Sequence, residues 1–305
     1  MIPTLPILII TAVMIPVILE LFVRRKLRDP MEDSPKTREA FQLYHRYFPL
    51  LLAITILLMW SVFESAVIDD IFLNSLGTDY TPLIHSLEGD AVVRIQNMMW
   101  SPAASVYFSF MYMVMYPVTF YVSIFLFMFL DQKKVVKMLA LGYVVIYLAA
   151  LPFYLLFPVN EVWITSTRYH AYNLAHNLPI YDYSDVRGVL FEFSEANQAS
   201  YIMNSLNNCF PSLHTAISTF VPMVMFATNR RRWGYFTLWI ALSIVIGIFY
   251  LGTHWIIDMF AGLATSSFAL YVVVNLDYEL GYPLSPYDIR WKGKKVRWLS
   301  RKKQP

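Results

Sequence analysis

Residues 254–275 read "HWIIDMFAGLATSSFALYVVVN", and this stretch decides how the rest of the sequence is interpreted. After Asp258 no charged residue follows up to Asn275. A helix that crosses a bilayer needs about 20 mostly apolar residues. The stretch is therefore expected to form a transmembrane helix whose first turn carries a histidine and an aspartate.

The rest of the chain has the same character. Its 305 residues are 57% hydrophobic and 15% charged, whereas a soluble domain carries about 25% charged residues. Six further apolar runs are expected to span the membrane, at residues 2–23, 48–68, 102–130, 136–157, 211–228 and 235–251. The predicted fold class is all-α, a polytopic membrane helix bundle of about six to seven transmembrane helices plus an interfacial helix.

The segments outside the predicted spans help to divide the chain into three parts. Residues 86–101 mix charged and apolar side chains and suit an interfacial helix. No basic residue precedes the run at 2–23, so it is interpreted as a retained helix rather than a cleaved signal peptide. We expect residues 1–85 to hold N-terminal helices and a cytoplasmic loop, 86–276 the functional membrane domain, and 277–305 a basic cytoplasmic tail.

The basic residues predict an orientation. If the spans alternate, 21 of the 24 lysines and arginines fall on one side, in segments 24–46, 131–137, 229–234 and 276–305. The positive-inside rule then places the N-terminus outside and the tail in the cytoplasm of a multi-pass cell-membrane protein. The tail is expected to contact anionic lipid, and no nucleic-acid partner is expected.

Two of the expected helices begin on the outer side with histidines near their first residues. Pro211 suits the first helical position, which puts Ser212 and His214 in the first turn. Thr253 suits the N-cap of the last span, with His254 following it. Unpaired N–H groups and the positive ends of two helix dipoles at similar depth would form an anion site, for which phosphate is the commonest ligand.

The spacing of His254 and Asp258 indicates chemistry. Residues four apart share one face of a helix, about 6 Å apart. A carboxylate there can hold one imidazole nitrogen and leave the other exposed. An aspartate inside a membrane span is costly, which favours a functional role over a pair that only ties two helices together.

Other kinds of site have weaker support. The sequence contains neither a zinc-protease motif nor a P-loop. A metal held by His214, His254 and Asp258, and Ser212 as a nucleophile, remain alternatives. The single cysteine, Cys209, is interpreted as a small buried hydrophobic residue. No cofactor is expected.

The two histidine motifs resemble those of the type 2 phosphatidic acid phosphatase superfamily. "PSLHT" (211–215) resembles its second motif, and "YLGTHWIIDMFAG" (250–262) the end of its third. The chain departs from the family at Gly247 and Ile248, where the third motif has serine and arginine, and at 151–163, "LPFYLLFPVNEVW", where the basic first motif is absent. The leucine in P-S-L-H, the "YLLFP" segment (154–158) and the missing arginine are similar to the branch that contains inositol phosphorylceramide synthases.

The resemblance implies a phosphohistidine mechanism. His254 would be the nucleophile, Asp258 its orienting partner and His214 the acid that protonates the leaving oxygen. Ser212, Thr253 and an outer arginine would bind phosphate. Of the three outer arginines, Arg168 is preferred to Arg187 and Arg94, because it follows the place of the first motif most closely.

The expected function is therefore that of a membrane lipid phosphatase or phosphotransferase with its site at the outer face. Its partners would be a lipid phosphate or diphosphate substrate, the surrounding membrane lipids, and water or an alcohol or sugar acceptor. Two alternatives remain. One is a transporter that uses the His–Asp pair as a proton relay, and the other is a metal-dependent membrane hydrolase.

Overall fold

The computed structural model describes residues 35–63, 79–196 and 207–279. These residues are mostly helical, and the pairing of extended backbone within them is limited to two isolated bridges. The helices are α2 (Pro35–Phe63), α4 (Thr81–Glu88), α5 (Ala91–Met99), α6 (Pro102–Phe110), η2 (Met111–Met115), α7 (Tyr116–Phe129), α8 (Lys133–Leu156), η3 (Val162–Thr165), η4 (Thr167–Tyr169), α9 (His170–Ala175), α10 (Val189–Ala196), α11 (Leu213–Ala227), α12 (Arg231–Tyr250) and α13 (Ile256–Glu279).

Four long helical segments are apolar enough to cross a membrane, which makes this a membrane protein. They are Pro102–Phe129, Lys133–Leu156, Arg231–Tyr250 and Ile256–Leu276. The third, fourth, sixth and seventh predicted spans are thereby confirmed within a few residues. The total of six to seven is not confirmed, because residues 2–23 lie outside the described ranges and α2 is described only to Phe63.

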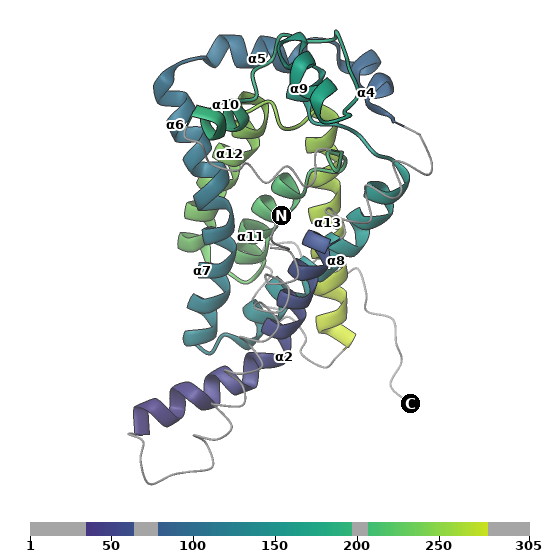
Figure 1. The fold of residues 1–305 in the computed structure, drawn as a ribbon. Coiled ribbons are helices and arrows are strands. Elements are labelled where there is room, and N and C mark those ends of the chain that lie inside the picture. Colours follow the sequence, from purple (N-terminus) through teal and green to yellow (C-terminus); the bar gives the residue numbers. More distant parts are fainter. Residues whose placement is uncertain (1–34, 64–78, 197–206, 280–305) are drawn as a thin grey trace, which may run out of the picture.

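The remaining predicted span, 211–228, forms the central helix α11. It has 15 residues, which is short for a bilayer. It packs against α8, α12 and α13 (Figure 1). The Phe220 ring lies on Gly142 of α8, where even a Cβ atom would come within 1.9 Å of it. This close contact holds α11 inside the bundle.

The first long segment changes helical form near the site. Ser101 caps it, with its hydroxyl oxygen accepting the N–H of Ala104. A π-helical turn, η2, then precedes Pro117, which lacks an N–H for the regular helical ladder. The turn carries Tyr112 toward α11, where its ring stacks on the ring of His214.

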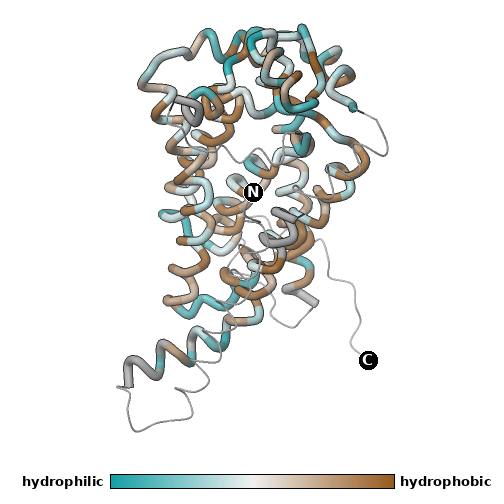
Figure 2. Tube along the Cα trace, viewed as in Figure 1, coloured by the Kyte–Doolittle hydropathy of each residue, from teal (hydrophilic) through white to brown (hydrophobic). Residues whose placement is uncertain are grey.

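The basic turns meet at one end of the bundle, as the alternation of spans predicts. Arg46 of α2 pairs with Asp131 at 3.0 Å, and Arg230 donates to Gln132. The opposite end carries α4, α5, α9 and α10 (Figure 1). Figure 2 shows the hydrophobic residues concentrated along the long helices between these ends.

The predicted interfacial helix at 86–101 is not continuous. It is divided into α4 and α5 at Gly89, whose φ of 53° breaks the helix. The segments between α8 and α11 likewise contain short helices, η3, η4, α9 and α10. Together these pieces cover the end of the bundle at which α11 and α13 begin.

Candidate active site

A strap of backbone, residues 158–163, ties the starts of α11 and α13 together. The Val159 N–H donates to the Asn207 carbonyl at 2.9 Å, and its own carbonyl accepts from the Cys209 N–H at 3.1 Å. On the other side, the Trp255 indole donates to the Asn160 carbonyl at 2.9 Å. The residues that stand in place of the family's basic first motif thus hold both histidine-bearing segments in position.

The start of α11 lies beside the first two turns of α13. The Ser212 N–H donates to the Asp258 carbonyl at 3.1 Å. A Cβ atom on Gly262 would come within 2.5 Å of the Ser212 carbonyl oxygen, so only glycine fits there. Ser212 is the N-cap, and its hydroxyl oxygen accepts the Thr215 N–H. The sequence had predicted Pro211 at the first helical position, and this prediction is wrong, because Pro211 precedes the cap.

The predicted role of Thr253 as the N-cap of the last span is wrong. The end of α12 closes through Gly252, with φ of 73°, and the Thr253 N–H and hydroxyl both donate to the Ile248 carbonyl, at 3.0 and 3.1 Å. This closure uses the residues that were expected to open the next helix. As a result, α13 begins later, at Ile256, and His254 precedes the helix instead of lying in its first turn as predicted.

The N–H groups at the start of α13 are not free, which corrects the prediction of two open helix ends. The Glu88 carboxylate accepts from Ile256 N–H at 2.8 Å and Ile257 N–H at 2.5 Å. A carboxylate is well placed at the positive end of a helix dipole. Burial nevertheless raises the pKa of Glu88 above its usual value. The Glu88 carboxylate therefore occupies the backbone N–H groups that the sequence analysis had expected to bind phosphate.

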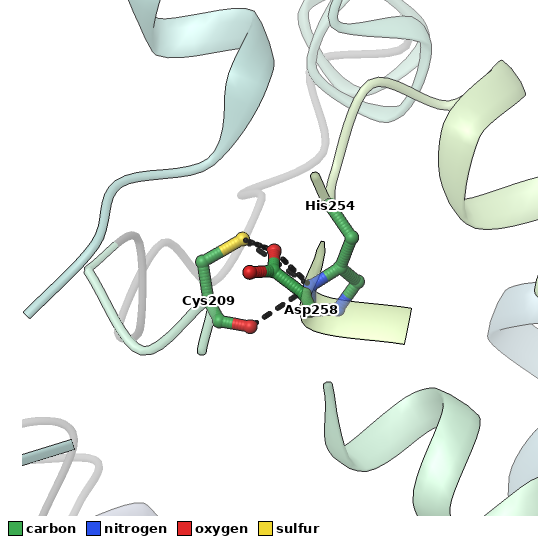
Figure 3. A group of neighbouring side chains, drawn as sticks. All are labelled: Cys209, His254 and Asp258. Atoms are coloured by element: carbon green, nitrogen blue, oxygen red, sulfur yellow. Dashed lines mark hydrogen bonds and ion pairs between the residues drawn. The ribbon is translucent and has the colours of Figure 1, made fainter. Parts of the chain in front are cut away.

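His254 and Asp258 are in contact, as their spacing predicts. His254 Nδ1 lies 3.3 Å from Asp258 Oδ2. The same oxygen accepts the Trp255 N–H at 2.8 Å and the Cys209 thiol at 2.9 Å. Figure 3 shows Cys209, His254 and Asp258 converging on one point. Asp258 is fully buried and held by three donors.

The tautomer of His254 follows from these contacts. Its Nδ1 also lies 3.1 Å from the Cys209 carbonyl oxygen, which can only accept. Nδ1 therefore carries the hydrogen, and Nε2 carries the lone pair. Burial lowers the pKa of His254 to about 4, so the ring is neutral at pH 7.

His214 lies opposite this lone pair. Its Nδ1 is 3.3 Å from His254 Nε2 and 3.3 Å from the Tyr112 hydroxyl. The Tyr112 ring stacks on the imidazole at 4.2 Å, and the Tyr116 ring lies at 4.7 Å. Sequence reasoning missed both tyrosines, because nothing in their spacing within an apolar run separates them from ordinary lipid-facing or core residues.

Neither predicted arginine forms a hydrogen bond or ion pair with the two histidines within the described ranges. The Arg168 side chain is exposed and lies 3.6 Å from Asp185. The Arg187 guanidinium lies over the Trp100 ring at 4.4 Å. The backbone of Arg187 is nevertheless close to the site, since its carbonyl packs against Gly252.

The group with metal-ligand geometry differs from the predicted one. Cys209, His254 and Asp258 present ligand atoms within 4.8 Å of one another, whereas the sequence had grouped His214 with the last two. Cys209 was expected to be a small buried hydrophobic residue. It is buried, but its thiol and its carbonyl both touch the His–Asp pair.

Comparison with known protein families shows to which family the chain belongs. A family model described as the PAP2 superfamily matches residues 85–272, more than half of the sequence. The chain belongs to the PAP2 superfamily. PAP2 proteins are phosphatases and phosphotransferases, which supports an enzyme acting on phosphate groups. No curated protein and no solved structure gave a significant match. The PAP2 match includes Glu88, the strap, both histidines and Asp258.

Proposed function

We propose that this PAP2 protein is an integral-membrane lipid phosphatase or phosphotransferase that works through a phosphohistidine. One observation carries the proposal. His254 is buried at the mouth of a membrane helix, with Nδ1 held by Asp258 and the Cys209 carbonyl and with Nε2 directed at a second histidine. A neutral imidazole fixed in this way can act as a nucleophile, because Asp258 already holds the ring in the orientation that attack requires.

In the first step, the Nε2 lone pair of His254 attacks phosphorus, and the bond from phosphorus to the leaving oxygen breaks. His214, which enters this step as an imidazolium after taking a proton from solvent, gives that proton to the leaving oxygen and becomes neutral. The hydrogen on Nδ1 stays in place, and the Asp258 carboxylate stabilises the positive charge that the imidazole acquires. In the second step, water or an acceptor hydroxyl attacks phosphorus, loses its proton to His214 and releases His254.

The resting contact between the histidines has a consequence for binding. Their nitrogens are 3.3 Å apart, which is a hydrogen-bond separation. A phosphorus atom cannot enter that space without separating the rings. Substrate binding therefore moves His214 away from His254, and the stacked Tyr112 ring is the surface on which the His214 ring can shift.

The phosphoryl oxygens need donors that stabilise their charge. The Ser212 hydroxyl oxygen accepts from Thr215, so its hydrogen can donate to a phosphoryl oxygen. The Thr253 hydroxyl already donates to Ile248, so we assign Thr253 a role in shaping the turn. Between the two arginines, the contact of the Arg187 backbone with Gly252 favours Arg187 over Arg168.

Three sequence features favour a phosphotransferase over a phosphatase. The leucine in P-S-L-H, the "YLLFP" segment (154–158) and the missing motif arginine resemble the inositol phosphorylceramide synthase-like branch. We propose an alcohol or sugar acceptor as the alternative to water, a lipid phosphate or diphosphate as donor, and a site on the outer face of the cell membrane. No cofactor is required by these steps.

The placement of charge argues against a transporter. Relay residues of a transporter would lie near the middle of several spans. In the four described spans, Lys and Arg occur only near the starts of α8 and α12, and Asp258 lies in the first turn of α13.

Turnover by the purified protein tests the proposal. The protein in detergent is given a panel of lipid phosphates and diphosphates, with and without alcohol acceptors. Wild type is expected to release or transfer phosphate, and His254→Ala to lose activity by orders of magnitude. His176→Ala, at an exposed histidine of the same face, is the matched control. Residual His254→Ala activity above about 10% of wild type would contradict a covalent role.

A further inference from the structure

Three side-chain atoms at the site lie at the separations of metal ligands. Cys209 Sγ is 2.9 Å from Asp258 Oδ2 and 3.2 Å from His254 Nδ1, and Nδ1 is 3.3 Å from Oδ2 (Figure 3). We propose that these residues form an inhibitory site for a soft divalent metal ion such as Zn²⁺ or Cd²⁺. The inhibition rests on the function proposed above, whereas the binding does not.

The distances fit a tetrahedral ion with little adjustment. Zinc is bound at about 2.3 Å by sulfur and about 2.0–2.2 Å by nitrogen and oxygen, which separates the ligand atoms by roughly 3.3–3.6 Å. The His254–Asp258 separation of 3.3 Å is at the lower end of that range. The two separations that involve sulfur, 2.9 and 3.2 Å, are about 0.4–0.7 Å shorter than a zinc-bound sulfur requires. The Cys209 thiolate would therefore have to move outward by about half an ångström.

Further donors can complete the shell. The Cys209 carbonyl oxygen lies 3.1 Å from His254 Nδ1, on the same side of the ring as the thiol. Asp258 Oδ1 is buried, and within the described residues it has no hydrogen-bond partner. The Trp255 N–H already orients the carboxylate through Oδ2, as outer partners commonly orient metal ligands.

The set of ligands selects the class of ion. A thiolate together with an imidazole favours zinc and its softer relatives, whereas magnesium, calcium and manganese prefer sites made of oxygen ligands. An ion such as Mg²⁺ is therefore not expected to bind here.

Occupation would remove the nucleophile. An ion on Nδ1 needs the lone pair of that nitrogen, so the neutral ring must lose its Nδ1 hydrogen and carry one on Nε2 instead. The Nε2 lone pair that attacks phosphorus is then gone, and the N–H points at His214. The Cys209 thiol loses its proton to the buffer, and nothing is oxidised or reduced.

The test uses the fact that Cys209 is the single cysteine of the chain. Full-length protein in detergent is stripped with a chelator and titrated with Cd²⁺. Cadmium–thiolate charge-transfer absorption then reports on Cys209 alone. Wild type is expected to show this band at about one ion per chain, and Cys209→Ser and Cys209→Ala to show none. Asp182→Asn, at an exposed surface His–Asp pair, should keep it.

Inhibition by Zn²⁺ is measured in parallel, with each variant normalised to its own activity in chelator. Cys209→Ser is expected to need at least about tenfold more Zn²⁺ than wild type, and Mg²⁺ should inhibit neither. Absence of the cadmium–thiolate band in wild type would overturn the proposed site. Equal Zn²⁺ sensitivity of wild type and Cys209→Ser would overturn its inhibitory role. A cadmium band in a protein without turnover on any substrate would count against the proposed function and leave the metal site standing.

Discussion

Asp258→Asn separates the charge of the aspartate from its geometry. Asp258 Oδ2 accepts from the Trp255 N–H, the Cys209 thiol and His254 Nδ1. An asparagine can keep a carbonyl oxygen at that position, and its amide would take the place of Oδ1. The variant therefore preserves the orientation of His254 and removes the negative charge beside it.

The size of the effect follows from one distance. The imidazole becomes positively charged in the transition state, with Nδ1 3.3 Å from Oδ2. At an effective dielectric constant of about 20, two unit charges at this separation interact by about 5 kcal/mol. This value is a ceiling, because the surroundings relax around the neutral variant. We expect kcat to fall by about 10²–10³-fold, or roughly 2.7–4.1 kcal/mol, which lies below this ceiling.

The assay is steady-state turnover of the best lipid phosphate in detergent micelles, at one fixed ratio of lipid to detergent. KM should change by no more than about threefold, because the charge acts on the transition state more than on bound substrate. Asp182→Asn is the matched control, since Asp182 lies 2.9 Å from His170 on the surface. It should stay near wild type. A kcat for Asp258→Asn within about tenfold of wild type, or a change confined to KM, would refute the reasoning.

Three further predictions concern charge, pH and topology. Arg187→Ala is expected to lower kcat by about 10²-fold, as removal of one preorganised donor does, and Arg168→Ala to have a smaller effect; the reverse order would return the phosphate-binding role to Arg168. Because burial lowers the pKa of His254 to about 4, its nucleophilic neutral form is lost only as the pH falls through about 4. A profile of kcat/KM against pH should therefore show no acid limb centred at the ordinary histidine value of about 6.5. A cysteine placed at the exposed position 182 should react with an impermeant thiol reagent in intact cells, and labelling only after lysis would place the site on the inner face.

Much of the fold follows from the sequence because its signals are local. The length of an apolar run sets the length of a helix, so Pro102–Phe129 and Arg231–Tyr250 begin and end close to their predicted bounds. The contact of His254 with Asp258 was predicted from their spacing of four residues, although His254 lies two residues before the start of α13. Alternation of spans places the starts of α11 and α13 at the same end.

What sequence reasoning missed depends on contacts between distant segments. Glu88 is 168 positions before the Ile256 N–H to which it binds, and no spacing rule connects them. The thiol of Cys209 meets Asp258 because the strap at 158–163 and the bond from the Ser212 N–H to the Asp258 carbonyl hold the two helix starts together. Thr253 was misassigned because a threonine after a glycine suits either the end of one helix or the start of the next.

The covalent intermediate on His254 is the central claim, and trapping it is the most direct test. Protein is mixed with a lipid substrate labelled at the transferred phosphorus, quenched in alkali within one turnover, and digested for mass spectrometry. The account predicts alkali-stable, acid-labile phosphate on His254 of the wild type, reduced in Asp258→Asn and absent in His254→Ala. Phosphate on another residue, or turnover by wild type with no labelled protein at any quench time, would contradict it.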